Sequence, residues 1–319
     1  MSPMRIAIVG AGGIGAVHAR HAARLPGVDI VVYDQDGSKA SALADLVGGR
    51  SLDSVGEAVL SCDCAVVGVP TDLHAEVALP FLKGGKPVLI EKPLTRTLAQ
   101  ADELGGYADL IAVGQVVRYF SDHRQVHDEV AGGAIGKPAA ARVRRSGGKP
   151  RNWNGWFGDY ARSGGVVLDL AIHDFDWLRW TLGEVESVFA CSAKASDPLL
   201  DGDFALTTLK MREGAVCHSE SSWMDVSFRT SIEVSGPLGC IEVDSRVNPT
   251  VRVDLPGSVQ TFSPQAACDD PYLLQMKAFV AFASGESSDI ATFADGRAAL
   301  QIALAAVESA QTGLTVHLS

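Results

Sequence analysis

The sequence predicts an α/β protein: an N-terminal doubly wound parallel sheet followed by a C-terminal α+β domain on an open, mainly antiparallel sheet. Three observations predict this. Residues 5–118 alternate short apolar runs with helical patterns, as parallel sheets covered on both faces do. A glycine-rich turn joins the first apolar run to the first helix. Residues 185–262 carry strand-like segments separated by turn residues, which is typical of antiparallel sheets.

The change of pattern near residue 118 and the length of 319 residues favour two domains, 1–118 and 119–319. In the first domain we predict strands at 5–10, 28–33, 64–69, 88–90 and 110–114, and helices at 14–25, 38–47, 73–83 and 98–105. In the second we predict strands at 139–145, 185–193, 204–211, 215–223, 228–235, 239–243 and 251–255, helices at 121–131, 168–182, 272–284 and 295–311, and a long loop at 147–165.

Composition excludes several classes of partner. The formal charge of −11 argues against nucleic acid and anionic membranes, which require concentrated positive charge. No apolar run approaches the roughly 20 residues of a membrane-spanning helix. The six cysteines lack the spacing of a disulfide framework, and the first residues show no signal-peptide pattern. We therefore expect a reduced, cytoplasmic protein.

The run Gly10-Ala11-Gly12-Gly13-Ile14-Gly15 follows the first strand directly and opens the first helix, as a dinucleotide-binding turn does. Gly10 permits the tight turn, Gly12 lets the backbone approach a pyrophosphate, and Gly15 allows close contact between helix and strand. Free N–H groups at the helix N-terminus then face the phosphates. A merely flexible turn is the alternative, and the flanking strand and helix disfavour it.

Asp34 ends the second strand, 19 residues after Gly15, where an acidic residue bonds the ribose hydroxyls of an adenosine. Its carboxylate would repel a 2′-phosphate, and no arginine follows immediately, so we expect NAD(H) rather than NADP(H) as cofactor. The neighbouring acid, Asp36, is interpreted as a helix-start residue.

Two further strand ends complete the predicted cofactor site. Thr71, at the end of 64–69, can offer its hydroxyl to the cofactor, whereas His74 either lines the site or only caps or packs its helix. Lys92, after strand 88–90, lies where open α/β sheets bind ligands, although a surface lysine in a turn is the alternative. The cofactor-binding residues that we predict are Gly10, Gly12, Gly13, Ile14, Gly15, Asp34, Pro70, Thr71, His74, Glu91 and Lys92.

Asp169 and His173 are four residues apart in the predicted helix 168–182, so they share one helix face. Removing a hydride from a secondary alcohol also requires the hydroxyl proton to leave, and an imidazole with a pKa near 6.5 is a suitable base. Lys92 could stabilise the developing alkoxide charge, and Asp169 could bind a substrate hydroxyl or orient the site. The alternative is that Asp169 and His173 merely satisfy each other.

The loop 149–156 combines tryptophan, asparagine and basic residues next to the domain boundary. Indole faces can stack on the C–H faces of a sugar, and Asn amides can bond its hydroxyls, although core packing is the alternative for each tryptophan. Candidate substrate residues here are Asn152, Trp153 and Trp156, and Arg118, Lys149 or Arg151 would read a carboxylate in an acidic substrate. The basic strand 142–145 is interpreted as a solvated face.

No metal site is expected. His123 and His127 share a helix face, but no carboxylate-rich segment accompanies them.

Three segments together resemble the glucose–fructose oxidoreductase / inositol dehydrogenase (Gfo/Idh/MocA) family. They are the Gly10–Gly15 turn, the triplet Glu91-Lys92-Pro93, and Gly164-Gly165-x-x-x-Asp169-x-x-x-His173. The resemblance continues through Gly236-Pro237-Leu238-Gly239 and Ala305–Gly313, so it covers essentially the whole chain. The triplet and the Asp-x-x-x-His segment are specific, whereas the dinucleotide turn is shared with many other enzymes.

The resemblance implies an NAD-binding Rossmann domain at 1–118 and a substrate-binding domain at 119–319, whose open sheet often mediates homodimer or homotetramer contacts. It implies Lys92, Asp169 and His173 as the catalytic group, a Lys92–Pro93 peptide that can be cis, and sugars, inositols or related polyols as substrates. The run Ile172-His173-Asp174-Phe175-Asp176 looks most like inositol 2-dehydrogenases.

Two departures bear on the substrate. Leu170 stands where such enzymes often carry a polar residue facing the ring, so it joins the candidate substrate residues. Val69-Pro70-Thr71 replaces the more common Thr-Pro-Asn. Two other functions stay open: NAD-dependent glycoside hydrolysis, which some relatives perform by transient oxidation, and non-catalytic sensing of a sugar or nucleotide by a regulator.

Overall fold

The computed structural model describes residues 3–148, 150, 155–194, 203–264 and 270–318. Its contacts divide the chain into two compact units, one of residues 1–116 with 269–297 and one of residues 117–268 with 298–319. Residues 269–297 thus belong to the first unit, although they follow most of the second unit in the sequence.

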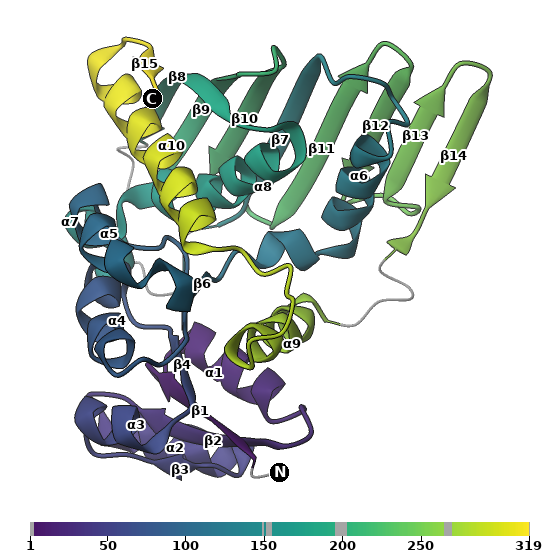
Figure 1. The fold of residues 1–319 in the computed structure, drawn as a ribbon. Coiled ribbons are helices and arrows are strands. Elements are labelled where there is room, and N and C mark those ends of the chain that lie inside the picture. The colour runs from purple at the N-terminus through teal and green to yellow at the C-terminus, as the bar shows by residue number, and fades with distance from the viewer. Residues whose placement is uncertain (1–2, 149, 151–154, 195–202, 265–269, 319) are drawn as a thin grey trace. The chain divides into compact units, whose positions relative to one another are not determined.

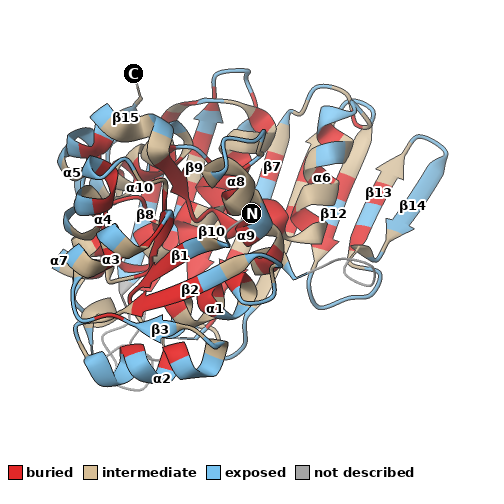
Figure 2. Ribbon diagram, turned by 60° about the horizontal axis from the view of Figure 1, so that its bottom comes forward, coloured by how far each residue is buried: buried red, intermediate tan, exposed pale blue. Residues whose placement is uncertain are grey.

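The first unit holds a six-stranded parallel sheet with the order β3-β2-β1-β4-β5-β6. Its strands are β1 (Met4–Val9), β2 (Val28–Tyr33), β3 (Arg50–Ser51), β4 (Cys64–Val67), β5 (Val88–Ile90) and β6 (Ile111–Val113). Figure 2 shows β1 largely buried, as its apolar run predicts. The predicted doubly wound sheet is therefore confirmed, and the strand order reverses between β1 and β4, where such sheets bind ligands.

Helices alternate with these strands as predicted. They are α1 (Gly13–Ala22), α2 (Gly37–Val47), α3 (Val55–Ser61), η1 (Thr71–Leu73), α4 (His74–Lys83), α5 (Leu98–Leu104), η2 (Gly105–Leu110) and the late helix α9 (Pro271–Ala283). Met276 and Phe279 of α9 share a core with Ala19 and Ala22 of α1. This apolar contact explains why α9 belongs to the first unit, a long-range arrangement that local sequence patterns do not show.

The second unit holds a nine-stranded sheet with the order β14-β13-β12-β11-β7-β10-β9-β8-β15. Its strands are β7 (Ala140–Ser146), β8 (Val185–Lys194), β9 (Asp203–Met211), β10 (Val216–Ser222), β11 (Arg229–Gly236), β12 (Gly239–Asp244), β13 (Val251–Leu255), β14 (Ser258–Phe262) and β15 (Val316–His317). All pairs are antiparallel except β7 with β10, so the mainly antiparallel sheet is confirmed.

One face of this sheet is covered by helices. In the second unit, α6 (Ser121–Ala131), α8 (Ile172–Leu182) and the larger part of α10 (Phe293–Thr312), from residue 298 on, lie on the same side of the sheet (Figure 1). Burial alternates along β9, where Asp203, Ala205 and Thr207 are buried and Leu206 is exposed. The opposite face is therefore open, as the sequence predicts.

The predicted loop 147–165 contains two short helices, η4 (Trp156–Gly158) and α7 (Tyr160–Ser163), which precede the π-helical turn η5 (Val167–Ala171). A short 3-10 helix, η3 (Val116–Tyr119), leads into α6. Four further elements, α3, β3, β14 and β15, are not predicted from the sequence. These elements are too short to show a periodicity, or, like β14, are almost wholly exposed.

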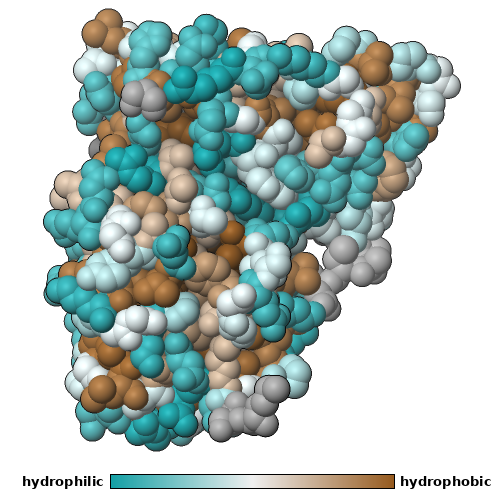
Figure 3. Space-filling view, viewed as in Figure 1, coloured by the Kyte–Doolittle hydropathy of each residue, from teal (hydrophilic) through white to brown (hydrophobic). Residues whose placement is uncertain are grey.

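Hydrophobic and hydrophilic residues are interspersed on the face that Figure 3 shows. Within the described part of the chain, no helix combines the length and apolar character needed to cross a membrane. The described cysteines 62, 64, 191, 217 and 240 are free thiols. Burial raises the pKa of Cys62 to about 11, which keeps this thiol protonated near neutral pH.

Candidate functional site

The glycines of the glycine-rich turn in the first unit are of two kinds: some lie against other backbone atoms, and some have free space beside them. A Cβ added at Gly15 would lie 1.8 Å from the carbonyl oxygen of Gly10. A Cβ at Gly10, whose φ is +100°, would lie 2.7 Å from the carbonyl oxygen of Gly68. A Cβ at Gly12 or Gly13 would meet no atom within 4 Å. Gly10 and Gly15 therefore allow the chain to close on itself, whereas Gly12 and Gly13 leave the backbone open toward a ligand.

The N-terminus of α1 fits a pyrophosphate. Its N-cap, Gly12, provides no side-chain hydrogen bond, and the first turn contains no acidic residue. The N–H groups of this turn and the positive end of the helix dipole thus remain available to an anion. Ile14 also lies in this turn, and its Cγ2 would be 3.3 Å from a Cβ added at Gly68.

Asp34 lies beside this turn, directly after β2. Its Oδ2 accepts a hydrogen bond of 2.7 Å from the Ala11 N–H, and its Oδ1 accepts one of 2.8 Å from the Asp36 N–H. The carboxylate is therefore held against the glycine turn by two backbone donors. Asp36 caps α2 through the Ser38 N–H, which confirms its interpretation as a helix-start residue.

The segment after β4 places Pro70 and Thr71 at a strand end of the same sheet, with the Thr71 side chain buried. His74 is fully buried, and its ring nitrogens lie 2.8 Å from the Pro93 carbonyl oxygen and 3.0 Å from that of Val69. Burial lowers the pKa of His74, and these two carbonyl contacts partly oppose that shift. The ring thus bridges the end of β4 and the triplet that follows β5.

Glu91 is buried and bonds the backbone of Lys92. Its Oε1 lies 2.7 Å from His18 Nε2, and its Oε2 accepts a hydrogen bond of 3.0 Å from the Lys92 N–H. Burial alone would raise the pKa of Glu91, but its contacts with His18 and Lys92 hold the pKa below its usual value. The sequence gives no signal for His18. The Lys92–Pro93 peptide is cis, as the resemblance allows.

In the second unit, two glycines turn the chain into the helix that carries Asp169 and His173. Gly164 and Gly165 have φ values of +77° and +73°. A Cβ at Gly164 would lie 2.5 Å from Leu168 Cδ2, and one at Gly165 would lie 2.5 Å from Tyr160 Cε1. Both the backbone conformation and the available space therefore require glycine.

From residue 166 to 178, the helical segment that follows leaves one narrow strip partly accessible. Residues 166–168, 171–172 and 174–178 are buried, whereas Asp169, Leu170 and His173 are half-buried. Asp169 belongs to the π-helical turn η5 and His173 to α8. The two predicted catalytic residues and one predicted substrate residue of this unit thus share the accessible side of the helix.

The buried side of α8 is fixed by two ion pairs. Asp174 Oδ1 accepts hydrogen bonds of 2.9 and 2.8 Å from the Arg145 guanidinium. Asp176 accepts a bidentate pair of 2.7 and 2.6 Å from Arg118. All four side chains are at most 5% exposed. Arg118, predicted to read a substrate carboxylate, instead has a carboxylate partner within the protein.

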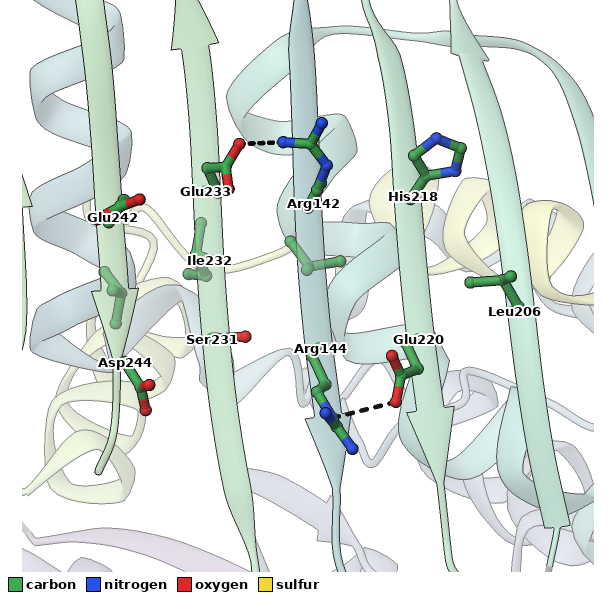
Figure 4. Close-up of a pocket in the computed structure, with 12 residues that line it drawn as sticks. Arg142, Arg144, Leu206, His218, Glu220, Ser231, Ile232, Glu233, Glu242 and Asp244 are labelled. Carbon is green, nitrogen blue, oxygen red and sulfur yellow. Dashed lines mark hydrogen bonds and ion pairs between the residues drawn. The ribbon is translucent and has the colours of Figure 1, made fainter. Parts of the chain in front are cut away.

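Arg145 corrects the interpretation of 142–145 as a solvated face. Arg142 and Arg144 do lie on the open face, but Arg145 has the opposite parity and points toward α8. The open face forms a hollow of about 650 Å³ whose lining includes Arg142, Arg144, His218 and Glu220 (Figure 4). None of the predicted site residues lines this hollow.

The structure describes some of the aromatic residues that were predicted to bind the substrate. Trp156 is half-buried and stacks on Phe157 with ring centroids 4.0 Å apart, and Phe157 meets the buried Trp223 edge-on at 6.5 Å. Asn152 and Trp153, and also Lys149 and Arg151, lie outside the described residues.

Sequence reasoning missed Asp203, the first residue of β9. Burial raises its pKa to about 6, and the nearby Val166 N–H partly opposes that shift. An available signal was the alternation of β9, which places Asp203 on the same inward face as Ala205 and Thr207. Within the described part of the chain, no group of three or more His, Cys, Asp or Glu side chains could hold a metal ion.

Comparison with known proteins agrees with this architecture. Residues 4–111 match the model described as "Oxidoreductase family, NAD-binding Rossmann fold", and residues 123–242 match the GFO/IDH/MocA C-terminal domain. The chain is 31% identical to myo-inositol dehydrogenase Hyg17 of Streptomyces leeuwenhoekii, over 97% of this chain and 98% of that protein.

Two solved structures are also similar. A myo-inositol dehydrogenase from Corynebacterium glutamicum superposes with a TM-score of 0.83 at 27% identity, over 99% of both chains. GenD2 from gentamicin A biosynthesis, in complex with NAD, gives a TM-score of 0.86 at 25% identity, over 100% of this chain and 97% of that one. The chain therefore belongs to the Gfo/Idh/MocA family and is an NAD-dependent oxidoreductase.

Proposed function

We propose that the chain transfers a hydride between NAD(H) and a secondary alcohol of a sugar, inositol or related polyol, as an inositol 2-dehydrogenase does. The observation that carries this proposal is the accessible strip of Asp169, Leu170 and His173, because every other residue from 166 to 178 is buried. The names of the relatives support the substrate class, since they include a myo-inositol dehydrogenase and a levoglucosan dehydrogenase.

The cofactor is proposed to bind at the glycine turn. The backbone N–H groups of Gly12, Gly13 and Ile14 would hold its pyrophosphate, because a Cβ added at either glycine meets no atom. Asp34 would bond the adenosine ribose. Its carboxylate, held by the Ala11 and Asp36 N–H groups, favours NAD(H) over NADP(H) by repelling a 2′-phosphate.

Four more residues of the first unit complete this proposal. Pro70 and Thr71 would line the cofactor site at the end of β4. Glu91 and His74 would act indirectly, by holding neighbouring groups in place, since their polar atoms already bond His18, Lys92 and two backbone carbonyls.

Each catalytic role is proposed from the proton or the charge that the side chain can carry. The bound nicotinamide supplies the hydride acceptor. His173 would take the hydroxyl proton of the substrate while the carbon that bears this hydroxyl loses the hydride. The Lys92 ammonium would stabilise negative charge that develops on the same oxygen, and Asp169 would bind a hydroxyl and orient the substrate. Trp156 and Leu170 would contact the apolar face of the ring.

Oxidation of a panel of inositols, aldoses and sugar acids, followed by NADH absorbance, tests this proposal. We expect reduction of NAD⁺ by one or more polyols, and a loss of kcat of about 10²–10⁴-fold in Lys92→Ala and in His173→Ala. The exposed Lys83→Ala and His317→Ala are the matched controls. Unchanged turnover in the Lys92 and His173 variants would refute the mechanism.

Two further assays, of aryl glycoside cleavage and of sugar binding, separate the other candidates. Cleavage of aryl glycosides without net NADH formation would indicate the glycoside hydrolase instead. Binding of a sugar without turnover, in a chain with intact Lys92, Asp169 and His173, would indicate the sensor.

We also propose a homodimer or homotetramer that forms through the open face of the larger sheet, in a cytoplasmic protein. Phe189, Leu206 and Val216 are at least 40% exposed on strands β8, β9 and β10. Light scattering on the purified chain tests the assembly, and an exposed-face variant such as Leu206→Arg should shift it to the monomer. A monomeric wild-type chain would contradict it.

A further inference from the structure

His18 is a buried imidazole to which the proposed catalytic and cofactor roles assign no task. It lies on α1, is fully buried, and its Nε2 is 2.7 Å from Oε1 of Glu91. Its Nδ1 is also buried and has no hydrogen-bond partner among the described residues. Within the described part of the chain, the hydrogen bonding of this ring is therefore directed to Glu91.

Glu91 bonds His18 with one oxygen and the backbone of Lys92 with the other. Its Oε2 accepts a hydrogen bond of 3.0 Å from the Lys92 N–H. Burial would raise the pKa of Glu91, but its contacts with His18 and Lys92 hold the pKa below its usual value, so the group stays ionised at neutral pH. Because a carboxylate only accepts hydrogen bonds, Nε2 of His18 is the donor.

The Glu91 carboxylate has little room to move. A Cβ added at Gly114, directly after β6, would lie 2.8 Å from its Oε1 and 2.9 Å from its Cδ. On the other side of Lys92, the Pro93 carbonyl oxygen lies 2.8 Å from a ring nitrogen of His74. The residues before and after Lys92 are thus each bonded to a buried histidine.

Helix α1 connects this contact with the proposed cofactor site. Its first turn carries the N–H groups proposed for the pyrophosphate, and His18 lies in the next turn of the same helix. The helix is fixed within the first unit, because its Ala19 and Ala22 share an apolar core with Met276 and Phe279 of α9. A group bonded to His18 therefore keeps its place relative to the pyrophosphate donors.

We propose that His18 is a positioning residue, which acts through Glu91 to hold Lys92 in place relative to the helix that binds the cofactor. The proposal rests on the functions proposed above for Lys92 and α1. An ammonium that stabilises a developing charge must lie close to the reacting oxygen, and a displacement of about 1 Å in a site can reduce the rate about 100-fold. His18 itself does not contact the reacting atoms.

Steady-state kinetics on full-length variants tests this inference, with kcat expressed per NADH-binding site from fluorescence titration. His18→Leu keeps an apolar side chain but lacks the donor, and we expect kcat to fall by about 10–100-fold. The dissociation constant for NADH should stay within about threefold, because the proposed pyrophosphate donors are backbone groups of the preceding turn. His18→Gln should recover most of the lost kcat, since its amide can donate in place of Nε2.

A double-mutant cycle tests whether His18 acts through Glu91. Glu91→Met is unbranched and lacks both acceptors, so it should by itself lower kcat by about 10–100-fold. The double variant His18→Leu/Glu91→Met should then have the kcat of Glu91→Met within about twofold, because the route to Lys92 is already broken.

His21→Ala is the matched control on the same helix. The His21 ring stacks on Tyr272 with centroids 6.2 Å apart, and the His18 ring meets the same Tyr272 edge-on at 5.9 Å. His21 pairs with Asp270 at 3.4 Å and not with Glu91. We expect His21→Ala to keep kcat within about twofold of the wild-type value.

Four results would overturn the inference. His18→Leu could keep kcat while Lys92→Ala and His173→Ala lose it, which would leave the proposed function intact and remove only the role of His18. The losses in His18→Leu and Glu91→Met could multiply in the double variant, which would show that His18 does not act through Glu91. His18→Leu and His18→Gln could both unfold, or both lose kcat and NADH affinity in parallel, which would make the role merely structural. Turnover that survives Lys92→Ala would overturn this inference and the proposed mechanism together.

If His18→Leu alone fails to fold, His18→Gln decides. A kcat close to the wild-type value supports the inference, and a loss of about tenfold or more per NADH-binding site overturns it.

Discussion

The Gly10–Gly15 turn of the first unit and the Gly164–His173 segment of the second are both glycine-led helix starts, but they hold their functional groups differently. In the first, Gly10 and Gly15 close the backbone on itself, and the available groups are main-chain N–H donors. In the second, the proposed functional groups are side chains, and the helix is fixed by the buried acids Asp174 and Asp176, each paired with a distant arginine. A site made of backbone needs only small residues at the right spacing, whereas a site made of side chains needs anchors elsewhere in the chain.

The largest effect is expected from the anchors of the second segment. Arg145→Met leaves Asp174 as a buried carboxylate without its partner, and should lower the free energy of unfolding by about 3–5 kcal/mol. The double variant Arg145→Met/Asp174→Leu should recover most of that loss, because no buried charge remains. Denaturant unfolding measures both.

Arg142→Ala on the same strand is the control for this pair. Arg142 is 62% exposed beside Glu233 and should cost less than about 1 kcal/mol. Equal losses for Arg142→Ala and Arg145→Met would show that the buried pairs do not fix α8.

A steric change tests the first segment. Gly15→Ala places a Cβ 1.8 Å from the Gly10 carbonyl oxygen, so it should destabilise the chain by about 3 kcal/mol or more and abolish NADH binding. Gly12→Ala meets no atom of the protein and should keep its melting temperature, while it weakens NADH binding tenfold or more, about 1.4 kcal/mol.

Gly56→Ala, inside helix α3, is the matched control, because its nearest atom would lie 3.9 Å from the new Cβ. It should be neutral or stabilising. Normal NADH binding by Gly12→Ala would show that the pyrophosphate does not approach this turn.

The acid beside the first turn offers a smaller, chemical test. Asp34→Ser removes the charge that repels a 2′-phosphate, so the ratio of kcat/KM for NAD⁺ over NADP⁺ should fall by about tenfold, or about 1.4 kcal/mol. The ratio is measured with one polyol for both cofactors. If Asp34→Ser keeps the wild-type ratio, another residue selects the cofactor.

The smallest expected effect is a dependence of folding stability on pH that arises in the second unit. His123 Nε2 lies 3.2 Å from the Arg145 guanidinium, and burial, with repulsion from that charge, sets the pKa of His123 well below its usual 6.5. The unfolded chain therefore binds a proton below about pH 6.5 that the folded chain does not bind. The contribution of His123 to stability is thus fully present above that pH and lost as the pH falls.

Denaturant unfolding at about pH 7.5 and pH 5.5 measures this loss, which His123→Gln should reduce. The same difference in wild type and variant would mean that His123 does not titrate on unfolding.

The same contrast explains what the sequence could predict. The alternation of strand and helix in residues 5–118, the glycine turn and the shared helix face of Asp169 and His173 follow from local spacing, and the fold class was correct. The contact of Met276 and Phe279 with α1 was not predictable, because it depends on a return of the chain to the first unit.

The site residues likewise include several whose contacts depend on partners far along the chain and not on local spacing. Arg145 looked like part of a solvated basic strand, because only its parity, set by the register with β10 and β11, turns it toward Asp174. Arg118 looked free to bind a substrate, since nothing nearby in the sequence marks Asp176 as its partner. Asp203 lies against Gly165, 38 residues earlier, and no local pattern reveals that contact.

The most direct test of the central claim is the fate of one hydrogen atom. The polyol that reduces NAD⁺ is prepared with deuterium on the carbon of its reacting secondary alcohol, and the NADH formed is analysed by NMR. Direct hydride transfer predicts one deuterium at the nicotinamide ring for each alcohol oxidised. NADH that carries no deuterium from the substrate would contradict the account.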